Sequence, residues 1–204
     1  MKKLLVTTAV IAAAALGGTG SALAATSATA TADLNIRSGP GPQYPPVGVI
    51  PGGNSATVEG CIKGSQWCEV SYNGTTGWSY GEYLRTNYQG QTVIIEQQPA
   101  SVPVVTYEAP ANAPAPAPVA GQLIGPVGST TVATIAPPPP TVQTYVEQNP
   151  VAPVYLSGEV VVGASVPQTV QLAPVPDYTY DYVYLNGQPA LVDPNSRRIV
   201  YVYR

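Results

Sequence analysis

Side chains that could support catalysis are sparse in this chain. It contains no histidine, and this excludes histidine-based triads, His–Cys nucleophile pairs and most zinc sites. Glu59 and Glu69 fall on neighbouring predicted strands, but a glycosidase needs paired carboxylates held at a fixed separation across a cleft. No loop concentrates the oxygen ligands, about six or more, that calcium requires. We therefore expect no catalytic residue, no metal site and no cofactor.

The two cysteines are the next candidates for chemistry. Gly64-Ser65 between them suits a two-residue hairpin turn, and that register places Cys61 opposite Cys68. In an exported protein, cysteines in this arrangement form a disulfide, which we expect here. The alternative is a reactive thiol, for which Lys63 is the nearby cation that could lower the pKa.

Aromatic side chains are better candidates for binding than for catalysis. Alternation along the predicted strand that begins at Trp67 puts this ring on the face opposite Cys68 and Val70. A second turn at Asn73-Gly74 pairs Glu69 with Trp78. The alternative is that Trp67 and Trp78 serve only as edge and core packing.

The elements that must position these residues lie between residues 31 and 86. Short apolar runs alternate with turn residues at close spacing, which predicts a small β-barrel or sandwich. The segment resembles a bacterial SH3 domain, because its motifs occur in that family's order. They are Leu34-Asn35-Ile36-Arg37-Ser38-Gly39-Pro40 at the start, the central Trp67, the pair Gly77-Trp78, and Tyr83-Leu84 at the end.

The resemblance implies a module that binds cell-wall peptides or partner proteins. In the related eukaryotic pattern, the positions of Trp67 and Tyr83 line a groove for proline-rich peptides, and Tyr80 stands where proline is usual. The resemblance therefore makes Trp67, Tyr83, Tyr80 and Arg37 the candidate ligand-binding residues. For Arg37 we expect an ion pair at the barrel surface with Glu59 or Glu82, and the alternative is contact with a ligand carboxylate.

Residues 1–24 have the pattern of a secretory signal. Lys2 and Lys3 precede an apolar stretch, and Ala22-Leu23-Ala24 is a small-x-small cleavage site. A transmembrane anchor is the alternative, but the apolar stretch is short and ends in Gly and Ser rather than at a charged stop. We expect an exported protein, periplasmic or extracellular, with no membrane span after cleavage. A small, polar leader at 25–31 is expected to be frayed.

Residues 87–157 differ in composition from the barrel. Most of the 23 prolines of the chain lie between 97 and 176, and charged residues are rare there. Proline lacks the backbone donor, so we expect Pro137 to Pro140 and its neighbours to form neither helix nor central strand. The composition predicts a polyproline-like, mostly disordered spacer. Its prolines could fold back and weakly cover the surface of Trp67 and Tyr83.

Order is expected to return at 158–204. Strands are predicted on both sides of the Asn186-Gly187 turn and again after Asp193-Pro194, as a small antiparallel β meander. This tail resembles an uncharacterised family of domains in small secreted bacterial proteins. The matching residues are Val166-Pro167, Leu172, Pro174, Pro176, Leu191-Val192-Asp193-Pro194 and Arg197-Arg198-Ile199-Val200.

Together these features predict a mainly β, exported envelope protein that is not an enzyme. Its barrel is expected to bind peptidoglycan stem peptides or an envelope protein. The alternative is a purely structural or interaction protein, and a cell-wall hydrolase is the least favoured class. A net charge of −3 without any basic patch excludes a nucleic-acid partner.

Overall fold

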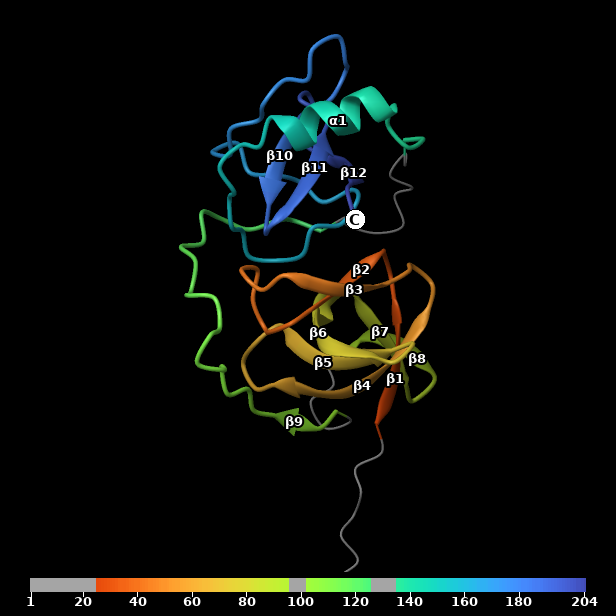
Figure 1. Cartoon of the computed structure of the whole chain (residues 1–204). Helices are drawn as coiled ribbons and strands as arrows, with labels where there is room; N and C mark the ends of the chain where they lie inside the picture. Colours follow the sequence, from red (N-terminus) through yellow and green to blue (C-terminus); the bar gives the residue numbers. More distant parts are fainter. Residues whose placement is uncertain (1–24, 96–101, 126–134) are drawn as a thin grey trace, which may run out of the picture.

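The structure is a computed structural model that describes residues 25–95, 102–125 and 135–204 (Figure 1). The predicted signal segment lies outside the described residues. The protein is mainly β, with a barrel formed by the first part of the chain and a smaller unit of sheet and helix stacked on it. Among the described residues, no helix has the length and apolar character needed to cross a membrane.

The barrel is a twisted antiparallel sheet in the order β3-β2-β6-β5-β4-β1-β7-β8. Its core consists of inward-facing aliphatic residues such as Leu34, Ile36, Ile50, Val70 and Leu84, all fully buried. Its elements are β1 (Thr26–Ala30), β2 (Leu34–Arg37), β3 (Pro46–Ile50), β4 (Ser55–Ile62), β5 (Trp67–Tyr72), β6 (Thr75–Tyr80), the 3-10 turn η1 (Gly81–Tyr83), β7 (Leu84–Tyr88) and β8 (Gln91–Ile94).

The two predicted hairpin registers are confirmed. Cys61 lies opposite Cys68, and Glu69 lies opposite Trp78. Asn73 and Gly74 both have positive φ angles, 47° and 81°, as a primed turn requires.

The barrel extends beyond its predicted boundaries at both ends. Residues 26–30, expected to be part of a frayed leader, form β1 between β4 and β7. The alternating Ala28 and Ala30 are each 1% exposed, so small side chains suffice for burial where neighbouring strands are close. At the C-terminal end of this segment, β8 pairs with β7 and continues the sheet to Ile94, and Ile95 is fully buried.

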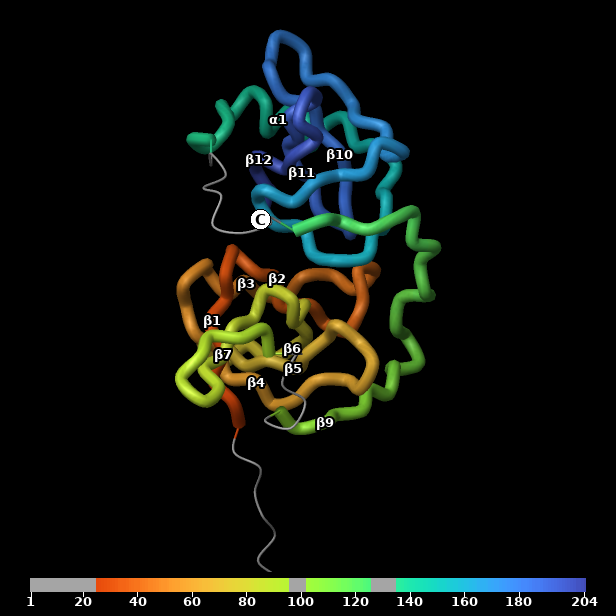
Figure 2. Tube along the Cα trace, turned by 180° about the vertical axis from the view of Figure 1, so that it is seen from behind, coloured from red at the N-terminus to blue at the C-terminus, as the bar shows by residue number. Residues whose placement is uncertain are grey.

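Residues 102–125, which we call the strap, lie within the interval predicted to be a disordered spacer. In the structure the strap begins with β9 (Val104–Val105), which pairs in parallel with β4. It then runs along the side of the barrel and crosses between the barrel and the C-terminal unit (Figure 2). Its few aliphatic residues explain the docking, because Val102 and Leu123 are 7% and 2% exposed.

The C-terminal unit contains the predicted meander and one helix that was not predicted. The meander consists of β10 (Asp181–Leu185), β11 (Gln188–Val192) and β12 (Ile199–Val202). The helix α1 (Pro140–Gln148) contradicts the expectation that the tetraproline run excludes helix. Pro140 occupies the first helical position, where the missing N–H has no intrahelical partner to lose.

The meander is buried on both faces. On one face, Tyr182, Leu191 and Val200 pack with Val142 and Val146 of α1. The unit therefore begins near α1 rather than at residue 158. The other face joins the barrel in one continuous apolar core, to which the meander contributes Val183, Leu185, Ala190, Val192, Ile199 and Val202. The barrel and the C-terminal unit consequently pack as a single body.

Candidate functional site

Arg37 lies at the junction of the barrel and the C-terminal unit rather than at the surface. Both its side chain and that of Glu159 are fully buried, and the two form an ion pair. Nε donates to Glu159 Oε2 at 2.8 Å and Nη2 donates to Oε1 at 2.5 Å, so the pair is bidentate. The expected surface pair with Glu59 or Glu82 is therefore wrong. β2 stacks beneath the C-terminal unit, so its outward side chains are enclosed rather than exposed.

The remaining polar atoms around this pair are also satisfied. Arg37 Nη1 donates to the carbonyl oxygens of Tyr44 at 2.8 Å and of Asn186 at 3.1 Å. Asn35 Nδ2 donates to Glu159 Oε1 at 3.0 Å and to Gln188 Oε1 at 2.7 Å. The Leu-Asn-x-Arg motif of the barrel thus connects directly to the C-terminal unit. This buried network leaves Arg37 no free donor edge for a ligand carboxylate.

Glu159 remains ionised in this enclosed position. Burial by itself would raise the pKa of its carboxyl. The charge and hydrogen bonds of Arg37, with further hydrogen bonds from Asn35 and the Val160 N–H, outweigh burial and hold the pKa below its ordinary value.

The predicted aromatic ligand residues lie together, but they are not open to solvent. Trp67, Tyr80 and Tyr83 are 7%, 6% and 5% exposed. Trp67 packs edge-on against Tyr80 with ring centroids 5.5 Å apart, and Tyr80 lies 6.3 Å from Tyr83. The three rings therefore form a cluster whose surface is mostly enclosed by the protein itself.

Part of that enclosure comes from the strap. A Cβ at Gly125 would lie 2.6 Å from the Tyr83 hydroxyl and 3.3 Å from its Cζ, so the strap backbone lies against the hydroxyl end of this side chain. Glycine is needed there because any side chain would collide with Tyr83. The spacer was predicted to cover Tyr83 through its prolines. In the structure a residue of this interval does lie against Tyr83, but it is Gly125. Pro140 belongs instead to α1, which packs on the meander.

A second aromatic group forms a slot on the side of the barrel. Tyr44, from the loop between β2 and β3, and Trp78 of β6 are 7% and 6% exposed. Tyr107 of the strap packs edge-on against both rings, with centroids 5.9 Å and 5.3 Å away and interplanar angles of 87° and 79°. A Cβ at Gly39 would collide with the ring of Tyr44, so the glycine of the opening motif makes room for this residue.

The strap also pairs with the last residues of β4, beyond the part of that strand that pairs with β1. The Cys61 N–H donates to the Pro103 carbonyl at 2.9 Å, and Val104 and Val105 lie beside Cys61 and Ile62. A Cβ at Gly60 would lie 2.5 Å from Val105 Cγ1 and 2.8 Å from the Pro103 oxygen. Gly60 therefore leaves the space that this part of the strap occupies.

The predicted disulfide is present. Cys61 and Cys68 are bonded across the β4–β5 pair. The bond lies next to the strap, because Cys61 itself carries the hydrogen bond to Pro103. A reactive-thiol function is thereby excluded for the oxidised protein.

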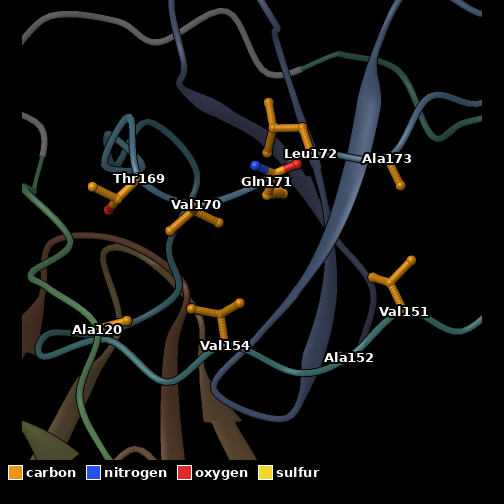
Figure 3. A pocket seen from close by; sticks show the side chains of 9 residues that line it. All are labelled: Ala120, Val151, Ala152, Val154, Thr169, Val170, Gln171, Leu172 and Ala173. Carbon is orange, nitrogen blue, oxygen red and sulfur yellow. The ribbon is translucent and has the colours of Figure 1, made fainter.

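An apolar pocket lies between the C-terminal unit and Ala120 of the strap, away from the predicted residues. Its volume is about 420 Å³, and it lies between residues 151–154 and 169–173, with Val154 and Val170 on facing sides (Figure 3). Thr169 and Gln171 are its polar side chains. Across the three described ranges, no group of three or more His, Cys, Asp or Glu side chains could hold a metal ion.

Sequence reasoning missed three residues that organise these sites: Glu159, Tyr44 and Tyr107. Glu159 is one of the few charged residues between 97 and 176, and an isolated carboxylate among aliphatic residues is a usable signal for a buried ion pair. Tyr107 follows two valines in a proline-rich segment, which is a pattern that favours docking over disorder.

The fold and these surfaces define a two-part protein in which an SH3-like barrel is enclosed by its own C-terminal extension. Residues 32–85 match the bacterial SH3 domain, and residues 145–204 match the domain of unknown function DUF1236. Both sequence-based resemblances are thereby confirmed, and a bacterial SH3 domain is consistent with a binding role.

One curated relative matches part of the chain. Over 52 residues the chain is 44% identical to the Putative N-acetylmuramoyl-L-alanine amidase YrvJ of Bacillus subtilis (strain 168). The match covers 26% of this chain and 10% of that protein, so the chain spans only a small part of its relative. No solved structure matches the chain.

Proposed function

We propose that the protein is an exported, non-catalytic binding protein of the bacterial cell envelope, whose SH3-like barrel recognises a wall peptide or an envelope protein. The observation that carries this proposal is the 52-residue match between this chain and a putative N-acetylmuramoyl-L-alanine amidase, a match close in length to the bacterial SH3 segment at 32–85. The matched segment occurs both in an amidase and in this chain, which has no histidine. This supports a binding role for the segment rather than a role in cleaving a bond.

Two further features support export and a non-catalytic task. The Cys61–Cys68 disulfide suits an oxidising compartment outside the cytoplasm. Glu159, the most deeply buried acidic side chain of the described residues, is committed to Arg37 and Asn35 and is closed to solvent, which does not suit a general acid.

Sedimentation with purified peptidoglycan tests the proposal. The mature protein is expected to sediment with the wall material and to remain in the supernatant without it. Wall material should lose no turbidity during the incubation, because the protein is proposed to cleave nothing. Binding with loss of turbidity would replace the proposal with a hydrolase.

A structural or interaction protein is the second candidate, and the shared core favours it. Arg37, Trp67, Tyr80 and Tyr83, which would serve an open binding surface, are all at most 7% exposed in this protein. Absence from the wall pellet, together with cross-links to an envelope protein that form only outside the barrel in intact cells, would identify this second function.

A further inference from the structure

The strap contacts the barrel as a bound peptide would. Its backbone pairs with the edge of β4, and two residues after Val105 the ring of Tyr107 enters the slot between Tyr44 and Trp78. Peptides that bind by adding a strand to a sheet generally show both features. Their main-chain hydrogen bonds provide affinity, and pockets for individual side chains provide specificity. The barrel surface from the β4 edge to this slot therefore has the features of a peptide site.

Residues 103–112 of the strap bury little of their own surface on the barrel. β9 contains only 2 residues, and Val104 is 62% exposed. A cavity of about 120 Å³ remains where Pro103 and Val104 face Cys61 and Ile62. Residues 108–112, which follow Tyr107, are all exposed. A segment with little buried surface and imperfect packing opens at a small fraction of the global unfolding free energy.

Gly60 and Gly39 shape this surface without belonging to the strap. Gly60 leaves room for the Pro103 carbonyl and Val105, and Gly39 leaves room for Tyr44. The φ angle of Gly60 is not positive, so its backbone does not require glycine. The absence of a side chain at Gly60 instead leaves space for Pro103 and Val105 of the strap.

We propose that the β4 edge and the Tyr44–Trp78 slot form a binding site for an extended peptide with a β-branched residue followed two positions later by an aromatic residue, and that residues 103–107 are its intramolecular occupant. The inference rests on the proposed binding function of the barrel and specifies its ligand as a protein segment. An external partner carries the same pattern and displaces the strap.

The tether sets how strongly the strap competes. Covalent attachment gives the strap an effective concentration at the site on the order of mM, so even weak docking is well populated. The apparent affinity for an external peptide is reduced by the fraction of molecules in which the site is free. Weakening the strap should therefore strengthen binding in trans.

The test uses the full mature chain and a synthetic peptide with the sequence of residues 102–110. Val105→Ser with Tyr107→Ala loosens the strap while leaving every barrel residue in place. Titration calorimetry should show the peptide binding this variant at least tenfold more tightly than the unaltered protein. The peptide with alanine in place of its tyrosine should bind neither protein.

Val104→Ser is the matched control, because this neighbouring side chain points to solvent. It should bind the peptide as weakly as the unaltered protein does. Adding Gly60→Val to the loosened variant should abolish peptide binding, since the new side chain fills the space of the incoming strand. Equal peptide affinity in the unaltered and loosened proteins, or binding that survives Gly60→Val, would overturn the proposal.

A second measurement covers the case in which the loosened variant does not fold. Hydrogen exchange on Gly60→Ala should show faster exchange at Val105 to Tyr107 and unchanged protection in β5 and β6. Equal loss of protection in the barrel core would show that the strap is an integral part of the fold, and the proposal would fail.

Sedimentation of the same proteins with wall material tests the proposed function separately from this inference. Wall binding without peptide binding contradicts only this inference, and peptide binding without wall binding contradicts only the wall ligand.

Discussion

At the scale of single residues, the Arg37–Glu159 pair decides how the two parts of the protein meet. Removing two charges from water is expensive, and a buried pair is stable only if its geometry is good and its remaining atoms are hydrogen-bonded. Both conditions hold here, because Glu159 also accepts hydrogen bonds from Asn35 and from the Val160 N–H. We therefore expect the pair to specify one orientation of the C-terminal unit on the barrel more than it adds to net stability.

Substituting Glu159→Gln tests this role. The change leaves the Arg37 charge buried without a counter-ion, and the free energy of unfolding should fall by about 3–5 kcal/mol. Glu59→Gln is the matched control, because Glu59 is exposed and the change should cost less than about 0.5 kcal/mol. Urea denaturation followed by tryptophan fluorescence measures both. Equal midpoints for the two variants would contradict the assignment.

The pH dependence of stability follows from the same residue. Because the pKa of Glu159 is lowered in the folded protein, its contribution is fully present above the ordinary glutamate pKa of about 4.3. The contribution is lost as pH falls through the lower, folded-state pKa. The stability difference between the unaltered protein and Glu159→Gln should therefore shrink below about pH 4. Thermal unfolding at a series of pH values checks this, and a difference that grows in acid would refute it.

At the scale of elements, the β4–β5 hairpin supports both the barrel and the strap. Its disulfide closes a short loop, and its outer edge receives β9. The helix α1 is likewise supported from outside, because Tyr182 and Tyr184 donate their hydroxyls to the carbonyl oxygens of Asn149 and Val146. Each short element is thus stabilised by a neighbour rather than by its own length.

Replacing both cysteines by serine should lower the free energy of unfolding by about 2–3 kcal/mol, the value that chain entropy gives for so short a loop. The barrel should still fold, because its aliphatic core is unchanged. Denaturation with and without reductant measures the effect. The unaltered protein under reducing conditions is the control and should match the double variant. Loss of the folded spectrum in the double variant would show that the barrel depends on the bond.

At the scale of the whole molecule, the barrel and the C-terminal unit share one apolar core. Residues of the meander and of the barrel belong to the same buried cluster, and the strap joins it through Leu123. Neither part can separate from the other without exposing this core and the Arg37–Glu159 pair.

The protein should therefore unfold in a single cooperative transition. Calorimetry is expected to give equal calorimetric and van't Hoff enthalpies, as all-or-none unfolding requires. Substituting Val146→Ala in α1, which is 1% exposed, should shift that one transition rather than split it. Two resolved transitions, one insensitive to this change, would show that the units fold independently.

Local features were predictable because they depend on neighbouring residues. The Asn73-Gly74 and Asn186-Gly187 turns, the register of Cys61 against Cys68 and the meander all follow from short-range backbone preferences. The spacer was predicted poorly because proline content describes only local chain stiffness. It does not reveal that a few valines and Tyr107 find complementary surfaces on the barrel.

The sequence by itself determined the barrel, the disulfide, the meander and the families that they resemble, because each depends on residues close together in the chain. Only the tertiary structure decided the partner of Arg37, which lies 122 residues away, and the occupant of the Tyr44–Trp78 slot. An arginine can pair with any carboxylate that approaches it with suitable geometry, and the Tyr44–Trp78 slot can hold any aromatic ring that reaches it. Which carboxylate and which ring occupy these positions depends on how the whole chain buries its apolar surface. A local sequence pattern does not contain this information.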